Sequence, residues 1–231
     1  MNSAQLKILA CIFMLIDHIG AILYPNLRSL RIIGRLAFPI FVYLIAEGYR
    51  KTKNIKKYMS RLFIFAFISQ LAFNAAFLGS MTRPKVLYLN VFFTLAMGLY
   101  SLYLYDKNKK ILYVIIIALI CEFLNTDYGA FGVLLIFVSN RYFDNFKKLS
   151  TSYVCLMIIY VINVWITFKL ANPSVLLTDI IFNHLTIEPI ALISLIFIKL
   201  YNGERGWRLK YLFYVFYPAH LFIISIINNG Y

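Results

Sequence analysis

The stretch LKILACIFMLIDHIGAILY, residues 6–24, determines how the rest of the chain is interpreted. It is apolar almost throughout, and an α-helix of about 20 such residues crosses the hydrocarbon core of a bilayer. Asp17 and His18 lie side by side inside it. An Asp within a membrane span costs about 2.5–3.5 kcal/mol on insertion scales. The pair therefore either makes buried polar contacts with other helices or faces a hydrated cavity and performs chemistry.

The composition indicates an integral membrane protein. Of 231 residues, 62% are hydrophobic and 14% charged, and the mean hydropathy is +0.77; a soluble domain is nearer half apolar and a quarter charged. We expect one transmembrane domain over residues 1–231 with a retained first helix. The net charge of +14 is explained by basic cytoplasmic loops rather than by binding to nucleic acid. Cys11, Cys121 and Cys155 lie in apolar stretches without metal-binding spacing, so we expect packing roles.

The apolar stretches predict an all-α bundle of about nine transmembrane helices, with eight to ten compatible with the pattern. The predicted spans are 6–24, 32–49, 61–79, 87–105, 111–124, 128–143, 152–171, 179–200 and 211–229. The fifth and sixth are short, which is typical of a re-entrant pair or of tilted helices. Most of the 23 Lys and Arg residues fall on one side if the N-terminus is cytoplasmic, and this bias sets the predicted orientation.

Polar side chains fall at a similar predicted depth in several spans, a pattern typical of a hydrated cavity opening outward from the membrane centre. The candidate cavity residues are Glu47, Gln70, Asn74, Asn90, Glu122, Asp127, Tyr128 and Tyr217. Gln70 and Asn74 are four residues apart and share a helix face. The amides can instead form hydrogen bonds between helices, and Glu47 can form an interfacial ion pair with the basic loop that follows it.

Two histidines, His18 in the first span and His220 in the last, are hard to explain as packing residues. An imidazole takes and releases a proton near neutral pH, so both are catalytic candidates, together with Asp17 and Arg35. Asp17 can orient an imidazole, but adjacent helix residues point about 100° apart, so it can serve Arg35 instead. Arg35 can equally be the counter-ion of Asp17 or Glu122.

Eight short stretches, in order along nearly the whole chain, resemble the TraX family. They are MLIDHIG (14–20), IGRLAFPIF (33–41), EGYRKTKNIKKYMSRL (47–62), ISQLAFN (68–74), LNVFFTL (89–95), DYGAFGVLL (127–135), LYNGERG (200–206) and FYPAHL (216–221).

The resemblance implies a membrane acetyltransferase. The named member of the family acetylates the N-terminal residue of a conjugative F-type pilin, and similar membrane acyltransferases take the acyl group from acyl-CoA, with an intramembrane histidine as the usual catalytic candidate. By position, the resemblance points to Asp17-His18, Gly34-Arg35, Glu47, Asn90, Asp127-Tyr128 and residues 217–220. Many members have no pilin substrate, so the acceptor stays open.

We therefore expect transfer of an acetyl group from acetyl-CoA to an amine or hydroxyl of a polypeptide, glycan or small molecule, in the plasma membrane of a bacterium. His18 or His220 would be the general base or would carry the acyl group, and no metal is expected. Basic side chains at the cytoplasmic side would hold the phosphates of the cofactor. The candidates are Arg50, Lys53, Lys57, Arg61, Arg205, Arg208 and Lys210.

Three other functions remain open from the sequence. Asp17, Arg35, Glu122 and His220 could form the proton relay of a transporter, although no inverted repeat with paired broken helices is evident. A metal-dependent hydrolase could use His18, His184 and His220, although no HExxH-like spacing supports it. In a scaffold without catalysis, the polar groups would only join helices.

Overall fold

The computed structural model describes residues 1–79, 88–171, 187–207 and 211–229, and these confirm the all-α class. The elements are α1 (Ser3–Ile22), α2 (Arg28–Gly34), α3 (Ala37–Lys51), α4 (Ile55–Leu78), α5 (Val91–Asn108), α6 (Leu112–Phe123), α7 (Gly129–Arg141), α8 (Phe146–Ala171), the 3-10 helix η2 (Glu188–Ile193), α10 (Ser194–Lys199) and α11 (Leu212–Asn229). His184, Arg208, Lys210 and the first part of the predicted span 179–200 lie outside the described residues.

Four helical segments among the described residues are long and apolar enough to cross a membrane. They are Ser3–Ile22, Arg28–Lys51, Ile55–Leu78 and Phe146–Ala171. Shorter apolar helices occupy Leu112–Phe123, Gly129–Arg141 and Leu212–Asn228. Together they make this a protein of the lipid bilayer; the total of nine crossings stays a prediction.

Helix starts are set by asparagine caps, which satisfy backbone N–H groups that lack partners in the first turn. The Asn2 side chain accepts from the N–H of Gln5, whose own side chain bonds back to Asn2 and completes a capping box at α1. Asn54 caps α4 and Asn90 caps α5 in the same way, by accepting from Lys57 and Phe92 respectively.

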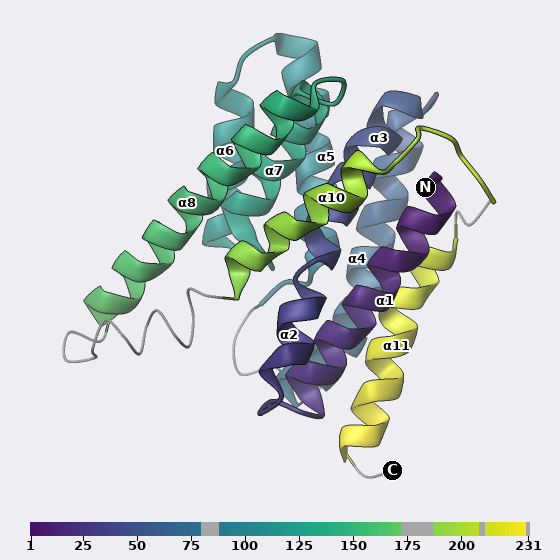
Figure 1. Ribbon diagram of the computed structural model, residues 1–231, viewed down its shortest axis with the longest axis vertical. Helices are drawn as coiled ribbons and strands as arrows, with labels where there is room; N and C mark the ends of the chain where they lie inside the picture. Colours follow the sequence, from purple (N-terminus) through teal and green to yellow (C-terminus); the bar gives the residue numbers. More distant parts are fainter. Residues whose placement is uncertain (80–87, 172–186, 208–210, 230–231) are drawn as a thin grey trace.

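In Figure 1, α1 and α11 run downward on the same side of the molecule, and α2 lies against the lower part of α1. Helix α3 ends near the top of the view, and α10 ends at about the height at which α1 begins. The first and last helices lie side by side, and α11 also packs along α4. Residues from the two ends of the chain are thereby brought into one bundle with α2 and α3.

The second predicted span, 32–49, is divided in the structure. Helix α2 ends at Gly34 and α3 begins at Ala37, with Arg35 and Leu36 between them. Pro39 falls in the first turn of α3, where its missing N–H would have no helical partner in any case. Arg35 and Leu36 keep right-handed helical backbone angles, so the two helices together still form one candidate span, Arg28–Lys51.

Helices α6 and α7 are shorter than the helix of about 20 residues that crosses a bilayer core. At 12 and 13 residues they are about 18–20 Å long, against about 30 Å of hydrocarbon. In Figure 1 their lower ends stop partway down the bundle. The segment between them, which carries Asp127 and Tyr128, therefore lies next to the break between α2 and α3, where Tyr128 stacks on Phe38 with ring centroids 3.5 Å apart.

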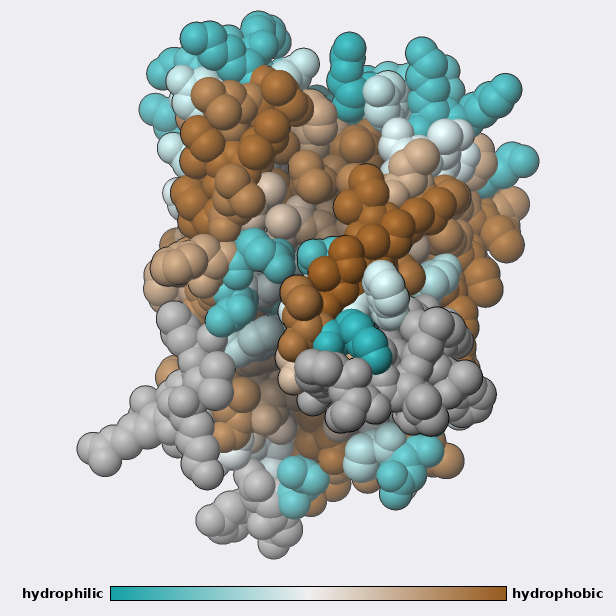
Figure 2. All heavy atoms as spheres, turned by 90° about the vertical axis from the view of Figure 1, so that its left-hand side faces the viewer, coloured by the Kyte–Doolittle hydropathy of each residue, from teal (hydrophilic) through white to brown (hydrophobic). Residues whose placement is uncertain are grey.

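Hydrophilic and hydrophobic residues occupy different heights on the surface of the molecule. Figure 2 shows hydrophilic atoms gathered at the upper end of the molecule and a broad hydrophobic band below them, with a few hydrophilic groups inside the band. Large apolar side chains such as Phe67, Leu119 and Ile159 are more than half exposed. Exposed side chains of this kind suit contact with lipid.

Candidate functional site

One cavity of about 740 Å³ extends along the inside of the bundle. Its walls include Lys7 near the beginning of α1 and His18 near the end of the same helix, so it is about 16 Å long or more at 1.5 Å per residue. Exposed residues at the basic end, Lys51 and Trp207, also line it. The volume is typical of a site for a small molecule.

His18 and His220 meet beside this cavity. Nδ1 of His18 lies 2.6 Å from Nε2 of His220, and the rings are parallel within 7° with centroids 4.9 Å apart. The centroid distance is larger than the 3.5 Å of the stacked Phe38 and Tyr128 rings, so the two imidazoles are joined edge to edge. Both are buried, at 8% and 5% exposed, but only His18 is among the lining residues. We call this pair the histidine dyad.

Tyr217 packs against both members of the histidine dyad. Its ring meets those of His18 and His220 edge-on at 5.9 and 5.7 Å between centroids. It lines the cavity although it is only 2% exposed. Its hydroxyl is buried near the backbone N–H of Val91 and has no acceptor of good geometry among the described residues.

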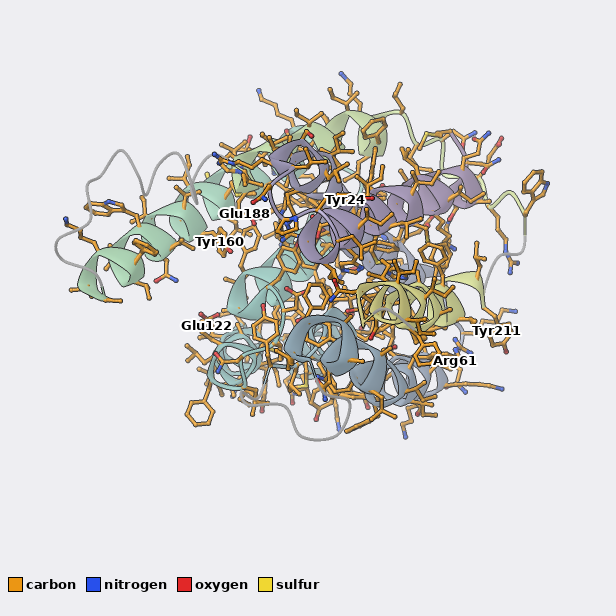
Figure 3. All side chains as sticks on the ribbon, turned by 90° about the horizontal axis from the view of Figure 1, so that it is seen from below. Tyr24, Arg61, Glu122, Tyr160, Glu188 and Tyr211 are labelled. Carbon is orange, nitrogen blue, oxygen red and sulfur yellow. The ribbon has the colours of Figure 1, made fainter. Side chains whose placement is uncertain are left out.

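Asp17 does not bond to His18 and belongs instead to a cluster of opposite charges. Arg31 Nη1 donates to Asp17 Oδ2 at 2.6 Å. Arg35 Nε lies 3.8 Å from Asp17 Oδ1 and 3.3 Å from Glu188 Oε1. Figure 3 shows Glu188 beside Tyr160, on the side of the bundle opposite Arg61 and Tyr211. We call Asp17, Arg31, Arg35 and Glu188 the charged cluster.

The segment between α6 and α7 completes this end of the cavity. Arg35 Nη1 donates to the hydroxyl of Tyr128 at 3.1 Å. The Tyr88 hydroxyl donates to Asp127 Oδ1 at 3.4 Å, and Thr94 bonds to the backbone carbonyl of Asp127. Asp127, Tyr128 and Tyr88 all line the cavity. The carboxylates of Asp17, Asp127 and Glu188 thus all lie near Arg35.

Glu47 holds together the opposite, basic end of the cavity. It is 5% exposed, receives Lys51 Nζ at 2.7 Å and the Ser3 hydroxyl at 3.3 Å, and also accepts from the hydroxyl of Tyr201. Burial and the hydrogen bond to Glu47 raise the pKa of Tyr201, so its hydroxyl stays a donor. Glu47 therefore forms an interfacial ion pair and also lines the cavity.

The basic candidates for phosphate binding separate into three groups. Arg61 and Arg205 line the cavity with Lys7 and Lys51. The Arg61 side chain also hydrogen-bonds to Tyr214, and its Nε is buried without a partner among the described residues. Arg50 and Lys53 line a different hollow of about 600 Å³, and Arg50 is paired with Asp144 at 2.5 Å. Lys57 is exposed and lines neither space.

The predicted amide group joins helices and does not face the cavity. Asn90 Nδ2 donates to Gln70 Oε1 at 2.7 Å and to the carbonyl of Ala66 at 2.8 Å. Gln70 Nε2 donates to Asn74 Oδ1 at 2.8 Å. None of the three amide side chains lines the cavity. They fix the start of α5 on α4, which is the alternative role the sequence left open.

Glu122 also differs from the expected cavity position. It is exposed, and its carboxylate accepts the N–H of Ala130 at 2.9 Å, where it complements the positive end of α7. It lies away from Glu188 in Figure 3 and is not a lining residue. The counter-ions of Arg35 are therefore Asp17 and Glu188.

The sequence alone did not identify several residues of the site. Arg31, Lys7, Lys51 and Glu188 were not among the candidate residues named from the sequence. The four-residue spacing of Arg31 and Arg35 was a usable signal, since it puts both on one side of a helix facing Asp17. Within the described part of the chain, no three His, Cys, Asp or Glu side chains form a possible metal site.

The chain is similar to known proteins over almost its whole length. The family model of the TraX protein matches residues 2–228. The chain is 29% identical to a probable fimbrial assembly protein FimC, serogroup H1, of Dichelobacter nodosus, over 96% of this chain and 94% of that protein. An uncharacterized protein, RP591, of Rickettsia prowazekii (strain Madrid E) is 45% identical over 29% of this chain and 25% of its own. No solved structure matches the chain significantly.

Proposed function

Because the chain belongs to the TraX family, we propose that it is a membrane-embedded acyltransferase that moves an acetyl group from acetyl-CoA to an amine or hydroxyl acceptor. The observation that supports this most is the single cavity between the basic side chains of Lys7, Arg61 and Arg205 and the imidazole of His18. A donor with a phosphorylated end and a long thioester arm needs such a space. The relative's name, a fimbrial assembly protein, favours a polypeptide acceptor.

In this proposal the nucleotide end of acetyl-CoA binds at the basic end of the cavity. Charge-assisted hydrogen bonds from Arg and Lys to phosphate are about twice as strong as neutral ones. Arg61, which lines the cavity, is the principal phosphate ligand, with Lys7 and Arg205 also on the cavity wall. The thioester arm then extends along α1 toward His18.

The reaction at His18 is a general-base acyl transfer. The acceptor nitrogen or oxygen attacks the thioester carbonyl carbon while its proton passes to His18. The carbon–sulfur bond then breaks, and the sulfur leaves as coenzyme A after it takes that proton. Tyr217, which lines the cavity beside His18, donates to the carbonyl oxygen as negative charge develops, a contribution that is often the largest in catalysis.

The charged cluster binds the acceptor at the other end of the cavity. Asp17, Arg31 and Arg35 line the cavity there with Asp127, so the acceptor approaches from the side opposite the cofactor. The proposal places the basic end in the cytoplasm and the charged cluster nearer the outer face of the plasma membrane, in accordance with the excess of basic residues at one end. Reporter fusions after residues 52 and 109 should both report a cytoplasmic location.

The test is transfer of radiolabel from acetyl-CoA to membrane or peptide acceptors by the purified protein in nanodiscs. His18→Ala should reduce transfer by about 10²–10⁴-fold, the usual contribution of a general base, at unchanged expression and thermal stability. Met157→Leu is a matched control, because Met157 is buried on α8 and does not line the cavity. Transfer by His18→Ala at the wild-type rate would exclude the proposal.

The same preparation separates acyl transfer from the transporter alternative. A proton-coupled permease should move protons across proteoliposomes without coenzyme A, and Arg35 or His220 variants should stop that flux. An acyltransferase should show acetyl-CoA-dependent labelling and no such flux. Flux without labelling would favour the transporter.

A further inference from the structure

The two imidazoles of the histidine dyad are not equivalent, because within the described part of the chain only His220 has a hydrogen bond to a backbone carbonyl. His220 Nδ1 lies 2.6 Å from the carbonyl oxygen of Phe216, one turn earlier in α11. A carbonyl oxygen can only accept a hydrogen bond, so Nδ1 of His220 carries a proton and donates it. In a neutral imidazole the other nitrogen is then an acceptor.

The tautomer of His18 follows from that of His220. Nε2 of His220 faces Nδ1 of His18 at 2.6 Å, with the rings nearly coplanar. Because Nε2 of His220 is the acceptor, Nδ1 of His18 must be the donor. Nε2 of neutral His18 is therefore left with the lone pair, and His18 is the member of the pair that lines the cavity.

We propose that the carbonyl of Phe216, His220 and His18 form an ordered chain in which His220 is a positioning residue that fixes His18 in the Nδ1-protonated tautomer and leaves Nε2 as the base. This rests on the proposed acyl transfer and assigns different roles to the two histidines. The arrangement parallels the logic by which a group behind a catalytic imidazole selects its tautomer and stabilises its charged form. Here a neutral imidazole takes that position.

The surroundings of the dyad favour this arrangement. Phe77 and Tyr217 flank the His18 ring edge-on, at 5.5 and 5.9 Å between centroids, and Phe216 lies 4.8 Å from the His220 ring. The phenyl rings of Phe77 and Phe216 offer no hydrogen bond to compete with the contact between the nitrogens. When His18 takes a proton, its Nδ1–H remains bonded to His220, and the added charge is shared through that bond.

The test reads the tautomer directly. Nitrogen-15 NMR of histidine-labelled protein in lipid distinguishes protonated from bare ring nitrogens, and the chain has only three histidines to assign. Without any substrate, wild-type protein should show His18 protonated at Nδ1 and bare at Nε2. The reverse tautomer at His18 would overturn the proposal whether or not the protein transfers acetyl groups.

Two substitutions of similar size test the role of His220. His220→Gln keeps an oxygen that can accept near the position of Nε2, whereas His220→Phe keeps an aromatic ring and removes the acceptor. His220→Phe should lose the single His18 tautomer and lower kcat by about 10²–10⁴-fold with little change in KM for acetyl-CoA. His220→Gln should retain the tautomer and most of the rate.

Failure of this proposal and failure of the acyl transfer are distinguishable. An unchanged His18 tautomer and rate in His220→Phe, at wild-type thermal stability, would overturn the role of His220 while leaving the acyltransferase intact. If NMR shows the predicted tautomers but no preparation transfers label from acetyl-CoA, the ordered chain is supported and the proposed acyl transfer is excluded. If His220→Phe does not fold, the NMR spectrum of the wild-type protein and the rate of His220→Gln still test the role of His220.

Discussion

A β-carbon built on Gly34 would lie 2.2 Å from the β-carbon of Asp17. Helix α2 therefore contacts α1 through bare backbone at the residue that pairs with Arg31 and Arg35. No side chain other than hydrogen fits there without movement, since atoms of real side chains do not approach so closely. The absence of a side chain at residue 34 is thus a condition for the charged cluster.

Gly34→Ala should force α2 away from α1 and lengthen the bond between Arg31 and Asp17. Overpacking of this kind costs about 1–3 kcal/mol, and we expect a lower midpoint of thermal unfolding in detergent. Ser60→Ala, at an exposed position of α4, is the control and should change stability by less than about 0.5 kcal/mol. An unchanged midpoint for Gly34→Ala would mean that α2 is not packed on Asp17.

Arg35→Gln should be the most damaging single change in the charged cluster. Arg35 is 13% exposed and lies between Asp17 and Glu188, and removal of one partner of a buried ion pair costs about 3–5 kcal/mol. Adding Glu188→Gln should recover part of the loss, because it removes the carboxylate left unpaired. Equal losses for the single and double variants, measured as free energies of unfolding, would contradict a direct ion pair.

The depth of polar residues could be predicted from the sequence, but their direction around each helix could not. Hydropathy placed His18, His220 and Arg35 within predicted spans, and the structure brings the first two into contact. The same reasoning grouped Gln70 and Asn90 with them, although those face the junction of α4 and α5. Direction depends on which helices become neighbours, and that is set by packing over the whole chain.

Basic residues show the same limit at the other end of the molecule. Arg50, Lys57 and Arg61 were equivalent in the sequence, since each lies in or beside the same loop. In the structure Arg61 faces the cavity, Arg50 pairs with Asp144 and Lys57 is exposed. The break at Arg35 was missed for a related reason, because hydropathy does not distinguish one continuous helix from two in succession.

Asn90→Ala should destabilise the protein more than the loss of a helix cap alone. A cap is worth about 1 kcal/mol, but Asn90 also donates to Gln70 and to the carbonyl of Ala66, and their loss leaves buried acceptors unpaired. Asn54→Ala is the matched control, since Asn54 caps α4 in an exposed position. Acetyl transfer per folded molecule should stay at the wild-type value; a selective loss of kcat would give Asn90 a catalytic role.

Arg61→Gln should raise the KM for acetyl-CoA, and Lys57→Gln should not. A hydrogen bond to a charged group contributes about 1.5–3 kcal/mol, which corresponds to roughly a tenfold or greater change in affinity. The two residues are one turn apart on α4, so they share sequence context, membrane depth and positive charge, and differ in whether they line the cavity. The comparison thus separates cofactor binding from the topological role of basic residues. Steady-state kinetics in nanodiscs at one fixed ionic strength would measure both constants, and equal values would assign Arg61 to topology alone.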